Sequence, residues 1–592
     1  MKYSDILADW LVSLGYTTCF YVAGGNIMHL LESCSRKMKI ICTVHEVAAG
    51  IAAEYFNEVA AGKERAFALV TAGPGLTNIV TAFAGAWLES RELLVLGGQV
   101  KVPDLSRGKL RQRGIQEIDG VNIVKPITVR SVLMDDVMDR ATFSEIVEAS
   151  SRGRKGPVFI EIPLDIQGRT LEPDTLEKKS AITHKSAIAA IPENDLAKLA
   201  EQVRKAERPL LLIGAGIDRR TSEEVRTRLD VMGLPLTTTW NGADRVAFDH
   251  PLYFGRPNTW GMRYSNLVLQ QADLLIALGT RLGLQQTGFN WQEFVPGGKV
   301  VQVDCDRAEL EKGNPKVAWP ICGDANQVLR YLSKADLGQH EAWVKYCKTI
   351  KSALPLVEEG NTTGTSFVSP YKFVTELSKL CKSTDVIVPC SSGGAFTVMM
   401  QTFAQQLGQK MVTNKGLASM GYGLSGAIGA AVAAEGQRTI LVEGDGGFSQ
   451  NLQEIGTVAV NKLNLKIFIF MDNGYASIRM TQSNYFGGRY MGCDTSSGLG
   501  LPNWEKLFAA YEVPAMRLDT NYAQDMAFKQ LFACEGPAAF IVPVDPKQTY
   551  FPKIMSRVTE TGGMASNPLH LMSPPLDEDT FKQVGRYLPP ST

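Results

Sequence analysis

The segment Glu443-Gly444-Asp445-Gly446-Gly447-Phe448 lies between two apolar stretches, and it decides the fold class. Residues 438–442 before it are short and apolar, 452–463 after it have helical spacing, and 465–471 form a second apolar run. This order predicts a strand, a tight glycine turn, a helix and a parallel second strand. The segment therefore predicts one βαβ unit of a doubly wound α/β domain.

Two aspartates follow the predicted strands of this unit. Asp445 ends the first strand and Asp472 comes 27 residues later, at the end of the second. Ligands gather at the carboxyl ends of parallel strands, so we expect both side chains at one edge of the sheet. Mg²⁺ prefers oxygen ligands and commonly completes its shell with phosphate oxygens and water. The spacing therefore predicts a magnesium diphosphate site, although these residues alone also fit an ordinary glycine turn with a solvated aspartate.

This pattern resembles the metal-diphosphate motif of thiamine diphosphate (ThDP) enzymes. The resemblance implies that Asp445, Asp472 and the backbone carbonyl of Gly474 are the metal ligands. It also implies that Gly446, Gly447 and Tyr475 lie beside the diphosphate. Asp472 stands where the family usually has Asn, which adds a negative charge. Either the metal preference differs here or Asn473 takes the role by a one-residue slip, and the spacing favours Asp472.

Composition limits the function classes. The chain has 592 residues, 45% of them hydrophobic, and 55 glycines, which is too much for one core and suits three domains. Lys plus Arg equals Asp plus Glu at 61 each, which argues against nucleic acid and anionic membranes as partners. The ten cysteines have no metal-binding spacing, so we expect buried thiols. The first 14 residues predict an amphipathic helix rather than a signal peptide, and we expect a cytoplasmic protein.

Resemblance to the acetohydroxyacid synthase-like branch of the ThDP enzymes covers nearly the full length and implies three doubly wound parallel-sheet α/β domains. The expected limits are 1–170 for the pyrimidine-binding domain, 185–350 for a middle Rossmann-like domain and 366–550 for the diphosphate-binding domain. Polar breaks at 169–184 and 354–370 predict the linkers. Residues 551–592 are rich in proline, which predicts an extended C-terminal tail.

Glu46 is the candidate catalytic carboxylate. The run 39–44 predicts a buried strand, and Glu46 begins an alanine-rich helix that extends to about residue 60. In ThDP enzymes a Glu in this position binds the aminopyrimidine of the cofactor and controls its protons. The alternative for the dipeptide His45-Glu46 alone is a carboxylate that complements the helix dipole.

Further motifs of the first domain resemble the same branch. The turn 71–78 resembles its TSGPGxTN sequence, and 97–100 resembles its GQV. The resemblance implies cofactor contacts from Gly24, Gly25, Pro74 and Asn78, and a substrate-binding role for Gln116 in Ile115-Gln116-Glu117. Ile115 replaces the usual Phe, and Leu164 replaces a Lys typical of the synthases. Leu164 puts a second keto acid as acceptor in doubt.

In the third domain, 414–424 resembles the branch's GxGTMGxGLPAAIGA stretch. The resemblance implies that Met420 holds the cofactor in a bent conformation and that the Ala418 carbonyl anchors the aminopyrimidine. It also implies contacts from Gly393, Gly394 and Ala395, which follow a strand predicted at 385–388. The alternative for Met420 is a core filler.

The middle domain of the synthases is six-stranded and carries FAD. The resemblance implies FAD contacts from Gly214, Gly216, Arg281, Asp304 and Asp324. Relatives keep this domain with another nucleotide or none, so a Rossmann-like spacer is the alternative.

The function implied is decarboxylation of a 2-keto acid, pyruvate in the first instance, and transfer of the acyl carbanion to a carbonyl acceptor. Residues 473–488 resemble carboligases of branched-chain deoxysugar biosynthesis, whose acceptor is a nucleotide-linked keto sugar. The alternatives are an acetolactate synthase that joins two pyruvates and a non-catalytic subunit. The implied cofactors are ThDP, Mg²⁺ and FAD, and the implied assembly is a homodimer or homotetramer.

Overall fold

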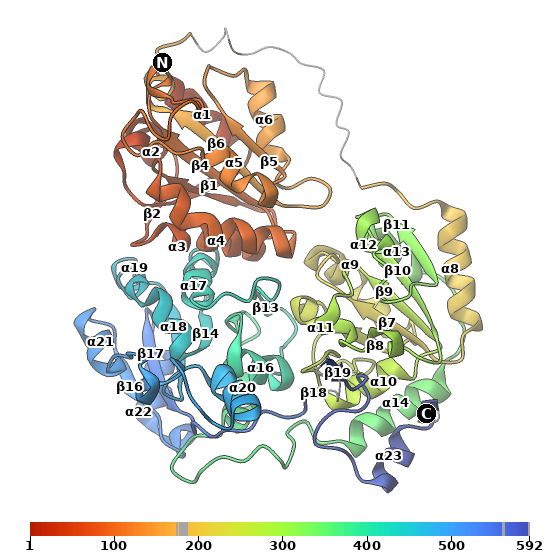
Figure 1. The fold of residues 1–592 in the computed structure, drawn as a ribbon. Helices are drawn as coiled ribbons and strands as arrows, with labels where there is room; N and C mark the ends of the chain where they lie inside the picture. The colour runs from red at the N-terminus through yellow and green to blue at the C-terminus, as the bar shows by residue number, and fades with distance from the viewer. Residues whose placement is uncertain (173–175, 177–187, 559–562, 590–592) are drawn as a thin grey trace. The chain divides into compact units, whose positions relative to one another are not determined.

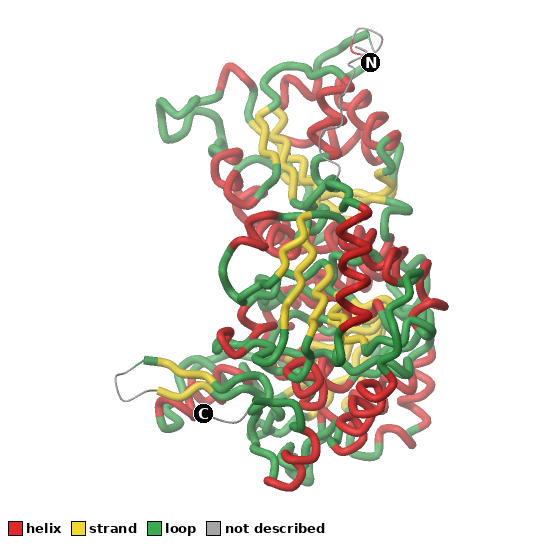
Figure 2. The backbone as a smooth tube through the Cα atoms, turned by 90° about the vertical axis from the view of Figure 1, so that its right-hand side faces the viewer, coloured by secondary structure: helices red, strands yellow, loops and turns green. Residues whose placement is uncertain are grey.

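The structure is a computed structural model that describes residues 1–172, 176, 188–558 and 563–589 (Figure 1). The chain divides into two compact units. The first combines Met1–Ala187, Thr384–Phe396 and Val412–Pro543, and the second combines Ile188–Ser383, Thr397–Met411 and Val544–Thr592. Helices and loops cover most of the strands (Figure 2), and each unit contains at least one parallel sheet.

The first sheet of the first unit has the strand order β2-β1-β3-β4-β6-β5, and all its neighbours are parallel. The strands are β1 (Tyr16–Tyr21), β2 (Lys39–Cys42), β3 (Arg65–Val70), β4 (Leu93–Gln99), β5 (Arg130–Leu133) and β6 (Pro157–Pro163). The helices are α1 (Tyr3–Ser13), α2 (Met28–Ser35), α3 (Glu46–Ala60), α4 (Pro74–Glu89), α5 (Gly120–Val124), α6 (Arg140–Glu148) and α7 (Leu164–Gly168). Strands β4 and β6 are buried along their whole length, as expected for inner strands of a parallel sheet.

Strand β2 differs from its prediction as a buried strand over 39–44. It ends at Cys42 and forms an edge of the sheet, paired only with β1. Lys39 and Cys42 are exposed. An apolar run alone does not distinguish an inner strand from an edge strand, because sheet position depends on distant pairing.

The second sheet has the strand order β13-β12-β14-β15-β17-β16, in which β13 is the short strand Lys410–Met411 and the neighbours from β12 to β16 are parallel. These strands are β12 (Val386–Val388), β14 (Thr439–Gly444), β15 (Leu465–Met471), β16 (Ala515–Arg517) and β17 (Ala538–Pro543). The helices are α17 (Tyr422–Ala433), α18 (Asp445–Phe448), α19 (Ile455–Val460), α20 (Ala476–Phe486), α21 (Trp504–Ala510) and α22 (Met526–Ala533).

The predicted strands on either side of the glycine segment are confirmed, but the segment between them is less regular than predicted. The glycines begin the short helix α18 instead of forming only a turn, and a 3₁₀ segment, Ser449–Glu454, follows. Asn451 has non-helical φ and ψ of −134° and 28° within it. The expected single helix over 452–463 therefore reduces to α19.

The second unit holds a parallel sheet ordered β11-β10-β9-β7-β8. Its strands are β7 (Pro209–Ile213), β8 (Leu236–Thr238), β9 (Leu274–Leu278), β10 (Lys299–Asp304) and β11 (Trp319–Cys322). Its helices include α8 (Glu193–Lys205), α9 (Arg219–Leu229), α10 (Arg263–Gln270), α11 (Leu284–Thr287), α12 (Arg307–Glu311), α13 (Ala325–Leu332), α14 (Glu341–Ala353) and α15 (Pro370–Leu380), and α16 spans Gly393–Thr402. Among the described residues this middle sheet has five strands, where the resemblance implied six.

The expected linkers and tail have different outcomes. Most of 169–184 lies outside the described residues, whereas 354–369 contains no helix or strand between α14 and α15. The C-terminal residues are not merely extended, because they form β18 (Ser556–Val558), β19 (Met564–Ser566) and α23 (Glu578–Val584). Leu569, Met572 and Val584 are buried in a core of the second unit. Apolar residues between the prolines thus fold this segment against the unit.

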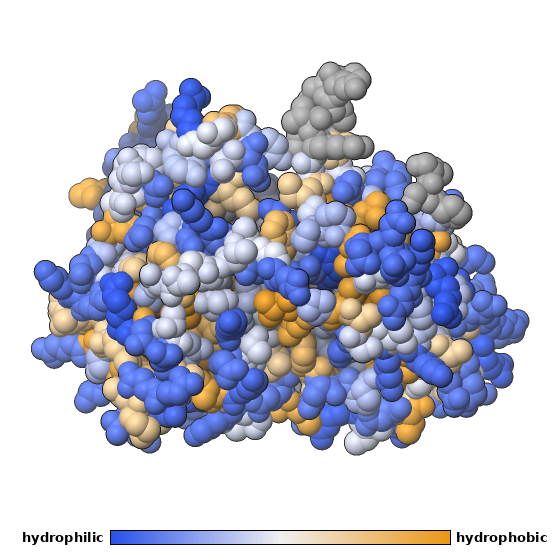
Figure 3. Space-filling model, turned by 90° about the horizontal axis from the view of Figure 1, so that it is seen from below, coloured by the Kyte–Doolittle hydropathy of each residue, from blue (hydrophilic) through white to orange (hydrophobic). Residues whose placement is uncertain are grey.

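No helix in the described ranges combines the length and hydrophobicity that crossing a bilayer requires. On the face seen in Figure 3, hydrophilic side chains surround scattered hydrophobic ones.

Candidate active site

Asp445 lies at the junction between β14 and α18 and is completely buried. Its carboxylate accepts hydrogen bonds from the backbone N–H groups of Gly446 at 2.7 Å, Asn473 at 2.8 Å and Gly474 at 3.3 Å. The ends of β14 and β15, which are neighbours in the sheet, therefore meet at this carboxylate. This is the convergence that the spacing of the two aspartates predicted.

Asp472 is buried beside Asp445, and Arg479 of α20 donates to both its carboxylate and its carbonyl at 2.9 Å. Burial raises the pKa of Asp472 to about 6, an effect that Arg479 opposes. Burial and the neighbouring charge of Asp472 raise the pKa of Asp445 well above its usual range. Asn473, by contrast, has an exposed side chain and a left-handed φ of 64°.

Two glycines allow the chain to close around this pair. A Cβ at Gly446 would lie 2.4 Å from the ring of Tyr475, and a Cβ at Gly474 would lie 2.1 Å from the carbonyl oxygen of Cys493. Real side chains do not fit at such distances, so these turns require glycine. The carbonyl oxygen of Gly474 also lies close to Gly446, since it would be 2.9 Å from a Cβ built on that residue.

These donors fit a divalent cation that shares its shell with a ligand. Two adjacent buried carboxylates repel one another, and a hard cation with oxygen ligands relieves that repulsion. Within the described ranges no group of three or more His, Cys, Asp or Glu side chains is arranged to hold a metal alone. Asp445, Asp472 and the Gly474 carbonyl therefore suit Mg²⁺ whose remaining ligands are phosphate oxygens and water.

Three other segments of the second sheet approach the same edge. Ser391 donates to the carbonyl of Ser419 at 2.5 Å, and Gln450 donates to the Met420 sulfur at 3.7 Å. Asn451 donates to the Gly421 carbonyl at 2.8 Å, just before α17. Figure 1 shows α17 and α18 beside β14. The segments that carry Met420 and Asp445 are thus joined by direct hydrogen bonds.

The predicted residues of these segments have distinctive conformations. Ala418 has a left-handed φ of 56°, and Met420 is 37% exposed although it is a large apolar side chain. Gly393 and Gly394 begin α16, where Gly393 has a φ of 84° and faces Ser477, and Ala395 is buried. A strained alanine and an exposed methionine at one sheet edge are features typical of a binding site.

Glu46 is the first residue of α3 and is 8% exposed. Asn78 on α4 donates to its carboxylate at 2.9 Å. The preceding His45 caps the helix, since its Nδ1 accepts from the N–H of Val47. Helix α4 begins at Pro74, which lies at its first position after Gly73. The predicted carboxylate is thus held by a second predicted residue, Asn78.

Gln116 lies against the same turn. It has a left-handed φ of 65°, and a Cβ at Gly73 would lie only 2.3 Å from its carbonyl oxygen. Gly24 packs equally closely on Thr71, where its Cβ would lie 2.3 Å from the Thr71 Cβ. Apart from its two chain neighbours, no described residue has a heavy atom within 4 Å of a Cβ built on Gly25. The first sheet therefore gathers Glu46, Asn78, Gln116 and these glycines at its carboxyl edge.

Helices α3 and α17 pack together in opposite directions. A Cβ at Gly429 would lie 1.9 Å from the Ala52 carbonyl oxygen, and a Cβ at Gly426 would lie 2.5 Å from the Tyr55 ring. The backbone N–H of His45 donates to Glu454 at 2.9 Å, at the far end of the 3₁₀ segment from Asp445. A helix rises about 1.5 Å per residue, so Glu46 and Met420 lie at opposite ends of this pair, roughly 20 Å apart.

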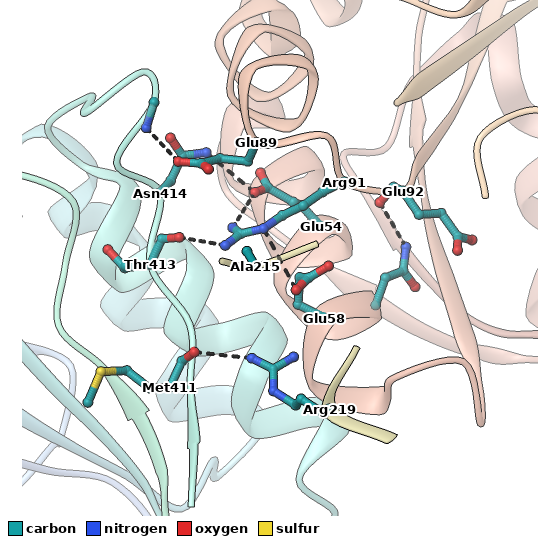
Figure 4. A network of polar contacts seen from close by, with 12 residues as sticks. Glu54, Glu58, Glu89, Arg91, Glu92, Ala215, Arg219, Met411, Thr413 and Asn414 are labelled. Carbon is teal, nitrogen blue, oxygen red and sulfur yellow. Dashed lines mark hydrogen bonds and ion pairs between the residues drawn. The ribbon is translucent and has the colours of Figure 1, made fainter. Parts of the chain in front are cut away.

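A buried polar network fixes this packing (Figure 4). Arg91 donates to Glu54 on α3 at 2.8 Å and to the carbonyl of Thr413 at 2.6 Å. The hydroxyl of Tyr422 on α17 donates to the other oxygen of Glu54 at 2.6 Å. The two groups of predicted site residues, one at each sheet, are therefore held apart within one chain.

The residues proposed for a nucleotide in the second unit have local structural roles. Gly214 and Gly216 pack against Gly279, where a Cβ on either would lie within 2.8 Å of a backbone or side-chain atom. Asp324 caps α13, and Asp304 is buried and accepts from the N–H of Asp306. The Arg281 carbonyl accepts from Lys312. These contacts account for the glycines and aspartates without a bound nucleotide, whereas the contact of Arg281 involves only its backbone.

Arg479, Glu454 and Glu117 were not assigned roles from the sequence. Glu117 follows Gln116 directly, and its buried carboxylate accepts from the backbone N–H groups of Ser106, Arg113 and Gly114. The sequence offered one signal for two of them, because Glu117 and Arg479 are charged residues close to predicted site residues. The partners of Arg479 and Glu454 lie in other elements, which a motif does not specify.

The chain matches three family models, which follow one another along it. These are the N-terminal TPP binding domain of thiamine pyrophosphate enzymes over residues 1–123, the central domain over 196–332 and the C-terminal TPP binding domain over 392–542. The chain is 28% identical over 571 residues to the acetolactate synthase large subunit of Cyanidium caldarium, with 93% of this chain and 94% of the relative covered. It is also 28% identical over 556 residues to the acetolactate synthase isozyme 1 large subunit of Escherichia coli K12, with 93% and 95% covered.

Proposed function

Because the chain belongs to the thiamine diphosphate-dependent enzymes, we propose that it decarboxylates a 2-keto acid, pyruvate in the first instance, and transfers the acyl unit to a carbonyl acceptor. The observation that carries the proposal is the pairing of Glu46 with Asn78 on one sheet and the convergence of Asp445 and Asp472 on the other. A binding subunit without catalysis has no need of a buried carboxylate held by a neighbouring amide.

The proposed cofactor contacts divide between the two sheets. Mg²⁺ is assigned to Asp445, Asp472 and the Gly474 carbonyl. The diphosphate is assigned to the backbone beside Gly446, Gly447, Tyr475 and residues 393–395, and the rings to Ala418, Met420, Gly24, Gly25 and Pro74. ThDP, when bound, supplies the electron sink for decarboxylation, which side chains lack.

The chain's own residues would control protons and orientation. Glu46, buried and held by Asn78, is placed to share a proton with a ring nitrogen of the bound cofactor. Gln116, exposed and held in a left-handed conformation, is placed to orient a substrate carbonyl or carboxylate. Gly73 supports this conformation, because any side chain there would displace the Gln116 backbone.

We further propose that each complete site forms between two chains. The antiparallel packing of α3 on α17 keeps Glu46 roughly 20 Å from its own Met420, which is too far for the aminopyrimidine of one cofactor to contact both side chains. A second copy that presents its Glu46 to this chain's Asp445 edge removes the difficulty and creates two equivalent sites. A homodimer, or a homotetramer built from such dimers, is the proposed assembly.

The proposed acceptor is a bulky carbonyl compound such as a nucleotide-linked keto sugar. Ile115 is 87% exposed next to Gln116, and neither it nor Leu164 nor Ala395 adds a cation that would bind a second keto acid. The second candidate is an acetolactate synthase, which the names of the relatives favour. The two differ in whether pyruvate alone gives a product.

FAD in the second unit remains a proposal, with a spacer that binds no nucleotide as its alternative. The domain limits 1–170, 185–350 and 366–550, followed by 551–592, likewise remain proposals. The matched ranges of the family models lie within the first three. Absorbance of the purified protein near 450 nm distinguishes a domain with bound FAD from a spacer that binds no nucleotide.

The test of the function is product analysis by mass spectrometry. Purified protein is incubated with ThDP, Mg²⁺, FAD and pyruvate, alone and with aldehydes, keto acids or nucleotide-linked keto sugars. The proposal predicts a two-carbon adduct only when a carbonyl acceptor is present. Acetolactate from pyruvate alone would favour the synthase, and no carbon dioxide under any condition would overturn the decarboxylation proposal.

A further inference from the structure

The segment 101–113 is strongly basic in a chain whose formal net charge is zero. It contains five basic residues, Lys101, Arg107, Lys109, Arg111 and Arg113, and a single acid, Asp104. All five basic side chains are exposed. A surface loop normally mixes both signs of charge, so this excess needs a physical reason.

The segment folds around an open pocket of about 350 Å³. The residues that line the pocket are Val102, Pro103, Leu105, Ser106, Arg107, Lys109, Leu110 and Arg113. Its wall therefore combines three cationic side chains with the apolar surface of two leucines. This composition suits a ligand that has an anionic group and an apolar body.

The positive charge of the pocket is largely uncompensated. Arg107 pairs with Asp135 at 2.9 Å, and both side chains are about half exposed. Lys109, Arg111 and Arg113 make no side-chain hydrogen bond or ion pair with any residue that the structure describes. Two of these, Lys109 and Arg113, face the pocket.

The loop is nevertheless held in place by its backbone. The Glu117 carboxylate accepts from the N–H groups of Ser106, Arg113 and Gly114, so it joins the middle of the basic segment to its C-terminal end. Asp165 accepts from the N–H of Val102 at 3.0 Å. Glu117 and Asp165 thus hold the backbone of the segment, and the Lys109 and Arg113 side chains remain available to bind a ligand.

The pocket is adjacent to the proposed reaction site. Arg113 precedes Gln116 by three residues, and the Gln116 backbone contacts Gly73 at the start of α4. The same helix carries Asn78, which binds Glu46. A ligand whose anionic group occupies the pocket can therefore extend its other end toward Gln116.

We propose that this pocket binds the phosphate or diphosphate group of the acceptor. The proposal rests on the proposed carboligase function and specifies its acceptor class. Arg and Lys bind phosphate oxygens through charge-assisted hydrogen bonds, and Arg does so with a planar fork. Pyruvate carries one negative charge and needs one cation, whereas the two uncompensated cations, Lys109 and Arg113, match the two charges of a diphosphate diester. The volume lies within the range of small-molecule sites and leaves room for an adjoining sugar.

The test is calorimetric titration of protein already loaded with ThDP and Mg²⁺, with native mass spectrometry to verify that ThDP stays bound. The probes are inorganic pyrophosphate, UDP, glucose 6-phosphate and, as a phosphate-free comparison, uridine. The double variant Lys109→Gln/Arg113→Gln should weaken the binding of pyrophosphate and UDP roughly 10- to 100-fold. The matched control Lys205→Gln/Arg220→Gln removes two exposed cations of α8 and α9 and should leave binding unchanged.

The outcomes are distinct. UDP that binds more tightly than glucose 6-phosphate indicates a nucleotide-linked acceptor, and equal affinities indicate a simple phosphate ester. Wild-type protein that binds none of the phosphate probes, or a double variant that binds them as wild type does, overturns the proposal. Carbon dioxide release from pyruvate is measured separately, so loss of the pocket proposal and loss of the decarboxylase proposal are distinguishable.

Discussion

Arg479 forms a buried ion pair with Asp472 at 2.9 Å, and each side chain is 8% exposed. Asp472 stands where the resembling motif has a neutral Asn, so it brings one more negative charge to a site already occupied by Asp445. Arg479 supplies the opposite charge from the next helix, α20. The pair therefore allows an Asp/Asp site to have the net charge of an Asp/Asn site.

Replacement of Arg479 by Met should destabilise the metal-free protein, because it leaves the Asp472 charge buried and unpaired. The expected loss in the free energy of unfolding is about 3 kcal/mol. The double variant Arg479→Met/Asp472→Asn should regain most of it, since neither charge then remains. Urea unfolding measures both, with the exposed Arg489→Met as control. A double variant as unstable as Arg479→Met would show that the pair does not act through charge.

Single substitutions can show whether the second metal ligand is Asp472 or its neighbour Asn473. Asp472→Asn should retain Mg²⁺-dependent ThDP binding within a few-fold, because an amide oxygen also ligates the ion. Asp445→Asn should weaken it at least about tenfold, since this carboxylate also organises both turns. Fluorescence titration with ThDP at fixed Mg²⁺ measures both. Collapse of binding in Asn473→Ala, with Asp472→Asn unaffected, would place the ligand one residue later.

Glu46→Gln should separate binding from turnover. Gln has nearly the same shape and still contacts Asn78, so ThDP affinity should change little. It cannot exchange a proton as a carboxylate does, and turnover should fall roughly 10²- to 10⁴-fold. Steady-state release of carbon dioxide from pyruvate measures the second quantity. Full activity of the variant would contradict the catalytic assignment.

Glu161 should make stability depend on pH. Burial, opposed by Gln99, raises the pKa of Glu161 on β6 to about 8 from an ordinary value of 4.5. A raised pKa means that its stabilising protonated form is fully present below pH 4.5 and is lost as the pH rises through 8. Between pH 6 and 8.5 wild type should lose about 2–3 kcal/mol more than Glu161→Gln. Urea unfolding at both values measures this, and equal losses would contradict the assignment.

The positions of the site residues at strand ends and helix starts could be predicted from the sequence, but the elements and side chains around them could not. The strand ends and helix starts that carry Asp445, Asp472 and Glu46 could be predicted, because apolar runs and glycine positions are local signals. The edge position of β2, the irregular backbone at Asn451 and the folded C-terminal segment depend on distant contacts, and they were wrong or missing. Arg479 and Glu454 were missed for the same reason, since their partners lie in other elements.

The separation of Glu46 from Met420 was also beyond the sequence. Helix α17 is buried along most of its length, and Gly426 and Gly429 allow it to lie close against α3. Its direction against α3 is set by Ala52 and Tyr55, together with the Arg91 network. The pairing of these helices supports the proposal, which the family resemblance also implies, that Glu46 and Asp445 of one chain serve different sites.

Complementation between two inactive variants tests this central claim most directly. Glu46→Gln and Asp445→Asn chains are co-expressed with different tags, and mixed oligomers carrying both are purified and assayed for carbon dioxide release from pyruvate. A site shared between chains predicts that one of two sites in each mixed dimer is intact, so these dimers should show about half of wild-type activity. Activity no greater than that of the single variants, with wild type active, would contradict a site formed between chains.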